Sequence, residues 1–259
     1  MSEFYRGRAM ENESVKVSAS DKEFLKKYNA DKYPRPSVTT DNVTFSIDEN
    51  GALSVLLVKR ARPPFAGCFA IPGGFLEPNE TVETCAVREI TEETNVTPRA
   101  IFPVGIFSTP GRDPRGWVIS CAFFSAVARE DVCAVGMDDA AQALWFAVSV
   151  SVSECGKTEM LTLKNGETTV TAQLERTGAP IGRSDFRVLS AEGLAFDHAA
   201  ILAAALDGAR AHCEDETFLR LFLPQNADDS ELSAVRGAIR SLWTLAENAY
   251  IGKIKYKEE

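Results

Sequence analysis

Short runs in the middle of the chain alternate apolar and polar positions, the pattern of half-buried β-strands. The runs NVTFSI and LSVLLVKR flank Asn50-Gly51, a dipeptide typical of tight hairpin turns. Further strand-like runs are AIFPVGIFS, WVISCAFFSAVA and ALWFAVS. A second Asn-Gly pair at 165–166 divides an alternating segment, which predicts a β-hairpin insertion at about 157–178.

Helical spacing of apolar residues appears on both sides of these strands. A short helix is predicted within SDKEFLKKYNADKY, and another within NETVETCAVREITEETN, where Ala86, Val87 and Ile90 share a face. Three more are predicted at about 197–212, 218–223 and 228–250. The element order indicates an α+β fold, an α/β/α sandwich with a mixed β-sheet and a small helical C-terminal region.

The same pattern divides the chain into three segments. Residues 1–36 are predicted to be an N-terminal arm, because they are polar and end in a proline-punctuated lead. Residues 37–192 hold the strands and form the main domain. Residues 193–259 form the helical C-terminal region, for which a degenerate winged-helix-like appendage is one alternative.

Composition excludes several classes of protein. The 259 residues are 45% hydrophobic and 25% charged, which is typical of a globular chain. No run of about eighteen apolar residues occurs, and Met1 to Lys16 mixes charges, so neither a membrane span nor a signal peptide is predicted. The six cysteines lack a CxxC pair, which favours reduced thiols in a cytoplasmic protein. A net charge of -9 makes nucleic-acid binding an unfavoured alternative.

Candidate chemistry is concentrated in one predicted helix. Glu89, Glu92 and Glu93 are three and four residues apart, so their carboxylates project from one helical face and repel one another. Arg88 can pair with Glu92, but one guanidinium does not neutralise three carboxylates, and a bound cation would supply the remainder. Oxygen ligands favour Mg²⁺ or Mn²⁺ over zinc. The alternative is a charged, solvated helix face without chemistry.

The spacing around this helix resembles the signature of the Nudix hydrolases. The matching positions are Gly74, Glu80, Arg88, Glu89, Ile90, Glu92, Glu93 and Val96. Asn95 stands where the family has glycine, and asparagine tolerates the left-handed backbone expected there.

The resemblance implies an enzyme with the Nudix fold and assigns roles to the signature residues. Glu89 and Glu93 would be the principal metal ligands and Glu92 a further one, with the Gly74 or Gly73 carbonyl as an additional ligand. Glu80 and Arg88 would hold the loop before the helix.

Flanking segments resemble one branch of this family, that of ADP-ribose pyrophosphatases and related Nudix-type transcriptional regulators. These segments are YPRPSVTTDNV, LLVKRARPPFAGCFAIPGGF, FSTPGRDPRGWVIS and GLAFDHAAIL. The resemblance implies Mg²⁺-dependent hydrolysis of ADP-ribose to AMP and ribose 5-phosphate by a homodimer. Arg60, Arg62, Arg112 and Arg115 are candidate substrate-binding cations, and surface charge is the alternative for each.

Two questions stay open at the level of sequence. The general base is either a glutamate of the signature helix or a loop carboxylate, Asp138 or Asp139, since Gln142 occupies the position where relatives often have an acid. The alternative function is an ADP-ribose-sensing or sugar-sensing DNA-binding regulator. Dense basic clusters are absent from the C-terminal segment, which favours the enzyme.

Overall fold

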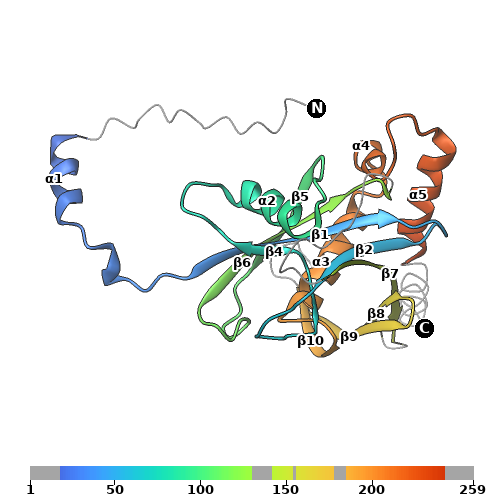
Figure 1. The fold of residues 1–259 in the computed structure, drawn as a ribbon, viewed down its shortest axis with the longest axis horizontal. Coiled ribbons are helices and arrows are strands. Elements are labelled where there is room, and N and C mark those ends of the chain that lie inside the picture. The colour runs from blue at the N-terminus through green and yellow to red at the C-terminus, as the bar shows by residue number, and fades with distance from the viewer. Residues whose placement is uncertain (1–17, 130–141, 154–155, 178–184, 243–259) are drawn as a thin grey trace, which may run out of the picture. The chain divides into compact units, whose positions relative to one another are not determined.

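The strands predicted from alternation form one mixed sheet in the computed structural model (Figure 1). The structure describes residues 18–129, 142–153, 156–177 and 185–242, and within these ranges the sheet has ten strands. They are β1 (Ser37–Ile47), β2 (Leu53–Lys59), β3 (Phe69–Ala70), β4 (Gly73–Phe75), β5 (Ile101–Phe107), β6 (Val118–Ala126), β7 (Ala143–Val152), β8 (Thr158–Asn165), β9 (Thr168–Thr177) and β10 (Asp185–Glu192).

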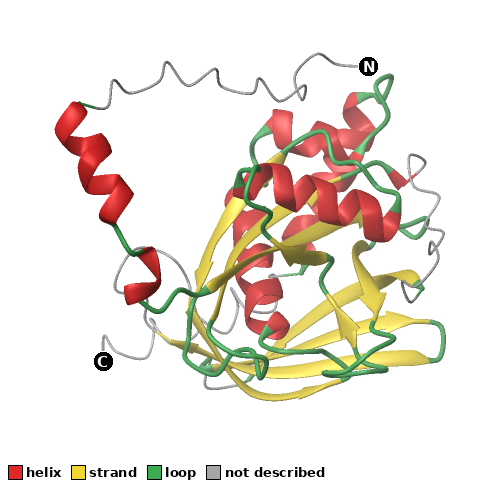
Figure 2. Cartoon of the chain, turned by 60° about the vertical axis from the view of Figure 1, so that its left-hand side comes forward, coloured by secondary structure: helices red, strands yellow, loops and turns green. Residues whose placement is uncertain are grey.

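The helices also follow the predicted order. They are α1 (Ala19–Lys27), α2 (Val82–Thr94), α3 (His198–Ala211), α4 (Glu216–Leu219) and α5 (Asp229–Ser241), with the 3-10 turns η2 (Ala30–Lys32) and η4 (Arg220–Phe222). The helix predicted at 228–250 is observed to Ser241, and its last residues lie outside the described part of the chain. Figure 2 shows helices of the segment 37–259, among them α2 and α3, against the twisted sheet.

The strand order across the sheet is β10-β9-β8-β7-β2-β1-β6-β5, with β3 paired to β2 and β4 paired to β1. The central pair β1 and β6 is parallel, and its neighbours on both sides are antiparallel. The predicted hairpin at 157–178 is confirmed as β8 and β9, with Gly166 at a positive φ of 53° in the turn. Strand β8 pairs with β7, so the hairpin extends the main sheet.

Both faces of the sheet are buried, as a sandwich requires. Along β2, Leu53, Val55 and Leu57 belong to the larger core, whereas Leu56 and Val58 belong to a smaller core with Ile90 of α2. This alternation follows from the two-residue period of a strand, which sends successive side chains to opposite faces. The predicted fold class is confirmed.

Helix α3 is part of the larger core. Its residues Ile201, Leu202 and Ala205 are buried in the same cluster as Leu57 and Phe146 of the sheet. Chain contacts separate residues 1–36 from residues 37–259 but place no further division after β10. The boundary predicted at residue 193 therefore stays a prediction. Between residues 198 and 242, which the structure describes, the chain forms helices and no strand.

The described part of the N-terminal segment is a short capped helix. The Ser18 hydroxyl accepts a hydrogen bond from the Asp21 backbone, and the Asp21 carboxylate accepts one from the Ser18 backbone. This reciprocal capping box starts α1 without any buried residue. Among the helices of the described residues, none is long and apolar enough to cross a membrane.

Candidate active site

Helix α2 carries the signature carboxylates and is fixed at both ends. Thr81 caps its start by accepting a hydrogen bond from the Thr84 backbone at 3.3 Å. Asn95 ends it with φ 57° and ψ 21°, so the left-handed backbone predicted for this substitution is confirmed. Cys85, Ala86 and Ile90 of this helix are buried.

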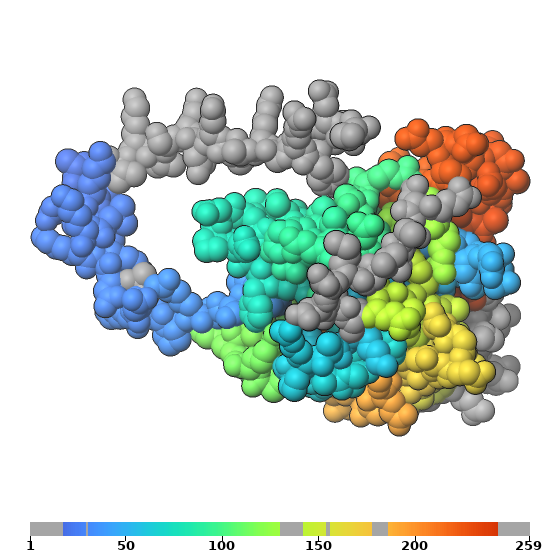
Figure 3. Space-filling model, in the orientation of Figure 1, coloured from blue at the N-terminus to red at the C-terminus, as the bar shows by residue number. Residues whose placement is uncertain are grey.

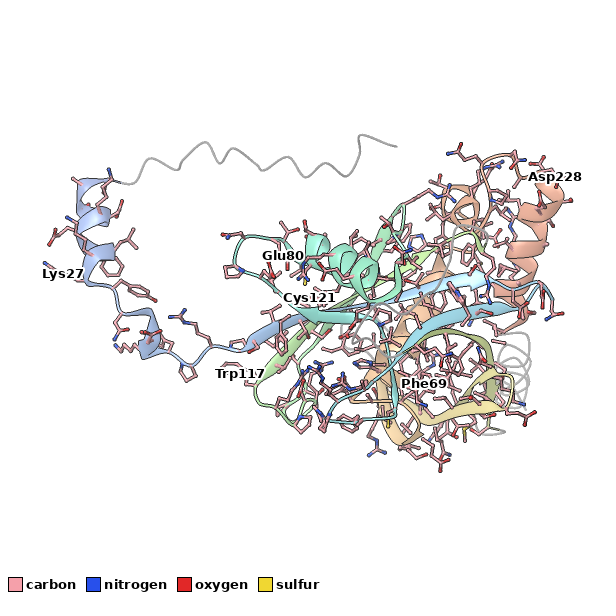
Figure 4. The ribbon with its side chains drawn as sticks, in the orientation of Figure 1. Lys27, Phe69, Glu80, Trp117, Cys121 and Asp228 are labelled. Atoms are coloured by element: carbon pink, nitrogen blue, oxygen red, sulfur yellow. The ribbon has the colours of Figure 1, made fainter. Side chains whose placement is uncertain are left out.

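Arg88 joins the helix to the loop before it. Its Nε and Nη2 donate to Glu80 at 3.0 and 2.6 Å, and its Nη1 donates to Glu89 at 2.8 Å and to Glu92 at 3.1 Å. The hydrogen bonds from Arg88 lower the pKa of Glu80 to about 2. Figure 4 labels Glu80 beside the start of α2. This arrangement fits the loop-holding role expected for Glu80 and Arg88.

The cavity beside α2 is lined by Glu89 and Glu93, the first and last carboxylates of the signature helix. Burial raises the pKa of Glu93 to about 7, although the Gly73 N–H, which donates to it at 3.1 Å, opposes the shift. Burial also raises the pKa of Glu89 against the opposing effect of Arg88. The structure does not bring Glu92 to the cavity, and its side chain is 60% exposed. Two of the three predicted carboxylates therefore face a possible ligand.

Gly74 lies directly against the Glu89 carboxylate. A Cβ at this position would lie 2.3 Å from Glu89 Oε1, so any side chain would displace that carboxylate. Gly73 is equally restricted, because a Cβ there would lie 2.1 Å from the Thr40 carbonyl oxygen of β1. The glycine pair thus lets backbone approach a carboxylate closely, a geometry in which carbonyl and carboxylate oxygens can share a hard cation.

The oxygen-only donor set fits Mg²⁺ or Mn²⁺, and the raised pKa of Glu93 shows that its negative charge lacks sufficient compensation. Within the described ranges, however, no three His, Cys, Asp or Glu side chains are already grouped around one point. Arg88 forms ion pairs with Glu80, Glu89 and Glu92. The expectation that Glu89, Glu92 and Glu93 need a cation in addition to Arg88 stays a prediction.

The cavity has a volume of about 680 Å³ and two chemically different walls. The acidic wall consists of Gly73, Gly74, Glu89 and Glu93. The basic wall consists of Arg60, Arg62, Arg112, Arg115 and Phe196. In the space-filling view of Figure 3, surfaces from the segments around β4 and α2, the β2–β3 loop and the β5–β6 loop adjoin on one face.

The structure brings all four predicted arginines to this cavity, and Arg112 and Arg115 each pair with a carboxylate. Arg112 donates from Nε and Nη2 to Asp197 at 2.8 and 2.6 Å, and its side chain is 5% exposed. Arg115 forms a similar two-pronged pair with Asp113. Arg112, one of the four candidate cations, therefore links the β5–β6 loop to Asp197 at the start of α3.

Sequence reasoning missed two buried polar residues that also line the cavity, His198 and Asp41. His198 Nδ1 accepts a hydrogen bond from the Ile71 backbone at 2.9 Å, and its Nε2 lies 3.5 Å from Asp41 Oδ1. Asp41 also accepts a hydrogen bond from the Ser120 hydroxyl. Because Nδ1 accepts a hydrogen bond, the proton of the ring lies on Nε2, and burial lowers the pKa of His198. The segment GLAFDHAAIL signalled a family resemblance but no role for this histidine.

The remaining candidates for the general base lie elsewhere. Asp138 and Asp139 fall outside the described residues. Gln142 is exposed, and its backbone carbonyl accepts a hydrogen bond from the Lys59 backbone at 3.2 Å. The assignment of the base therefore stays a prediction.

Comparisons with known proteins agree with the fold and with the signature helix. The NUDIX domain model matches residues 40–157. The chain is 45% identical to the ADP-ribose pyrophosphatase of Methanocaldococcus jannaschii over 122 residues, which are 47% of this chain and 67% of that protein. The chain therefore belongs to the Nudix family of hydrolases.

Two further relatives extend the comparison. The ADPR responsive transcriptional repressor NtrR of Acinetobacter baylyi is 34% identical over 117 residues, which are 44% of this chain and 46% of that protein. The crystal structure of a MutT/nudix family protein from Enterococcus faecalis matches with a TM-score of 0.69 and 27% identity, covering 93% of this chain and 90% of that one. The likeness to this structure thus includes α3, which lies beyond the matched family segment.

Proposed function

We propose that the protein hydrolyses ADP-ribose to AMP and ribose 5-phosphate with Mg²⁺ or Mn²⁺ as the cofactor. The observation that carries the proposal is a cavity in which Glu89 and Glu93 face Gly73 and Gly74, with arginines on the other wall. Identity to an archaeal protein named ADP-ribose pyrophosphatase supports the choice of substrate. The cavity volume lies within the range of about 300–1,000 Å³ typical of small-ligand sites.

The acidic wall supplies the metal site in this proposal. Glu89, Glu93 and the Gly74 carbonyl would hold the ion, and Glu92 would join them after turning away from Arg88. When bound, such an ion screens charge on phosphate oxygens and acidifies a coordinated water.

The chain's own residues orient the site. The Gly73 N–H orients the Glu93 carboxylate, and Arg88 orients Glu89. Because both carboxylates are largely buried, an ion or a proton must compensate each one when the site is filled. Arg60 and Arg62 supply positive charge for the diphosphate on the basic wall. The attacking water would lose its proton to Glu89, to Glu92 or to a carboxylate of the loop that contains Asp138 and Asp139.

Product analysis tests this proposal directly. Purified protein is incubated with ADP-ribose and Mg²⁺, and the products are separated by ion-exchange chromatography, with an EDTA-treated sample as the control. Equal amounts of AMP and ribose 5-phosphate that vanish with EDTA are expected. Dinucleotide coenzymes, nucleotide sugars and oxidised nucleoside triphosphates complete the panel. If the protein hydrolyses one of these compounds but not ADP-ribose, that compound replaces ADP-ribose as the proposed substrate. If it hydrolyses none of them and not ADP-ribose either, the proposal that the protein is a hydrolase is refuted.

A DNA-binding regulator is the second candidate, because one relative is named as a repressor. Its match spans less than half of that repressor, and no strand pair for a wing occurs among described residues 198–242. A gel shift with promoter DNA that weakens steeply with salt would favour the regulator. We also propose a homodimer, which sedimentation velocity tests.

A further inference from the structure

Two phenylalanines have a backbone conformation that bulky residues rarely adopt. Within the described residues, the non-glycine positions with positive φ are Phe65 at 61°, Asn95 at 57° and Phe196 at 52°. Asn95 is explained by the end of α2. The two phenylalanines contact each other edge to face, with ring centroids 4.8 Å apart. A strained conformation persists only where its surroundings hold it, and such positions cluster at ligand sites.

The Phe196 ring holds two arginines of the basic wall. The guanidinium carbon of Arg60 lies 4.9 Å from the ring centroid and that of Arg115 lies 5.3 Å from it. Both distances are those of a cation–π contact. One aromatic ring thus fixes two like charges in the same cavity, where they repel each other.

The two arginines differ in their compensation. Asp113 neutralises Arg115 through hydrogen bonds at 3.0 and 2.7 Å. The Arg60 Nε donates to the Pro64 carbonyl oxygen at 2.8 Å, and no carboxylate of the described chain forms an ion pair with this arginine. Burial, together with the charge of Arg115, lowers the pKa of Arg60 below its ordinary value, although the charges of Glu93 and Asp113 oppose the shift. Arg60 is therefore a partly buried cation with unmet capacity for an anion.

We propose that Phe196 is a positioning residue: its ring, buttressed by Phe65, orients Arg60 as an anion subsite that binds one phosphate of the substrate. Only the assignment of the bound anion as a phosphate of the substrate rests on the proposed function. A guanidinium presents paired N–H groups that match phosphate oxygens, and a ring fixed in place keeps this fork from rotating. Phe196 lies beyond the matched segment 40–157, so part of the site comes from the segment that leads into α3.

Calorimetric binding of inorganic pyrophosphate in EDTA tests the subsite without metal or turnover. Phe196→Leu and Arg60→Gln are each expected to weaken binding about tenfold, since a charge-assisted hydrogen bond is lost or misplaced. The double variant should bind no more weakly than Arg60→Gln, because Phe196 acts through Arg60. Phe196→Tyr keeps the ring and should retain the affinity of the natural protein. Losses that multiply in the double variant, or unchanged binding by Phe196→Leu, would overturn the proposal.

Phe186→Leu is the matched control, because it removes a ring that lies 4.7 Å from the Arg176 guanidinium away from the cavity. Its pyrophosphate affinity should equal that of the natural protein, and an equal loss there would show a general effect of removing an aromatic ring. With ADP-ribose and Mg²⁺, Phe196→Leu should raise KM about tenfold with kcat changed less than about threefold. If the variants change pyrophosphate affinity as expected but the natural protein does not turn over ADP-ribose, the anion subsite is supported and the proposed substrate is refuted.

Discussion

The two walls of the cavity are built in opposite ways. The acidic wall comes from one continuous stretch between Gly73 and Glu93, in which a loop and the following helix share Arg88 as their counter-charge. The basic wall combines the β2–β3 loop, the β5–β6 loop and the segment before α3, and its Arg112 pairs with an acid 85 positions away. Local sequence therefore specifies the acidic wall, whereas the folded sheet must form before the basic wall exists.

The two walls also differ in how far their charged groups are paired. Burial raises the pKa of Glu93, so in the proposed function the acidic wall would contribute charge for a cation. Arg112 pairs with Asp197 and so links the β5–β6 loop to the start of α3, whereas Arg115 pairs with Asp113 within its own loop. Substitutions in the acidic wall should change rate. In the basic wall, substitution of the paired Arg112 should change folding, whereas substitution of Arg60 or Phe196 should change ligand binding.

The largest expected effect is on the basic wall. Arg112→Met removes the partner of Asp197 and leaves that carboxylate half-buried beside Asp41, so the free energy of unfolding should fall by about 3 kcal/mol. Urea denaturation measures this loss. Arg187→Met is the matched control, since Arg187 pairs with Glu175 on the exposed surface and should change stability by less than about 0.5 kcal/mol. Equal losses of unfolding free energy in the two variants would contradict the proposal that Arg112 stabilises the fold more than a surface arginine does.

On the acidic wall, Glu93→Gln should lower kcat at least about a hundredfold while leaving the circular dichroism spectrum unchanged. The physical reason is that the amide cannot supply the negative charge for the metal. Glu83→Gln provides the control, because Glu83 lies in the exposed first turn of the same helix. Steady-state kinetics with ADP-ribose and Mg²⁺ measure both variants, and near-normal turnover by Glu93→Gln would contradict the metal assignment.

The pH dependence of stability sharpens the comparison in the metal-free protein. Burial raises the pKa of Glu93 from 4.5 to about 7, so the folded state holds this proton more tightly than the unfolded state. Its contribution is therefore fully present below pH 4.5 and lost as the pH rises through 7. Glu93→Gln should be more stable than the natural protein by about 2 kcal/mol at high pH, with a vanishing difference at low pH.

Chemical denaturation in EDTA at a series of pH values measures this difference. Adding Mg²⁺ at high pH should stabilise the natural protein but not the variant, because the ion replaces the proton on Glu93. A stability difference that does not depend on pH would contradict the uncompensated charge of Glu93.

The smallest effect concerns the end of α2. Asn95→Gly should raise the free energy of unfolding by about 0.5–1 kcal/mol, because glycine adopts the observed φ of 57° without steric cost. Thermal denaturation measures the gain. A loss of stability would show that the Asn95 side chain stabilises the fold by more than its left-handed backbone conformation costs.

Sequence predicted most of the fold and one wall of the site. The alternation of Leu53 to Lys59 fixed β2 and its two buried faces, and the signature spacing located Glu89 and Glu93 on α2. Both patterns are local, since they depend on helical and strand periods. Glu92 was expected in the site, but it pairs with Arg88, its side chain is 60% exposed, and it is not among the residues that line the cavity.

The other wall could not be predicted in the same way. Arg60 and Arg115 were named as cations, but their contact with Phe196 joins residues more than eighty positions apart. His198 and Asp41 meet only because α3 lies against β1 across the sheet. Nothing in the local pattern around either residue indicates the other, and only the order of strands in the folded sheet brings them together.

The position of α3 limits how this protein can be divided. The segment that matches the family ends at residue 157, near the start of β8, whereas Ile201 and Leu202 of α3 cover core residues of the earlier strands. A fragment cut at that boundary would expose this apolar surface to water and would lack Phe196 as well. Exchange of modules between relatives would therefore succeed only when the helix travels with the strands that it covers.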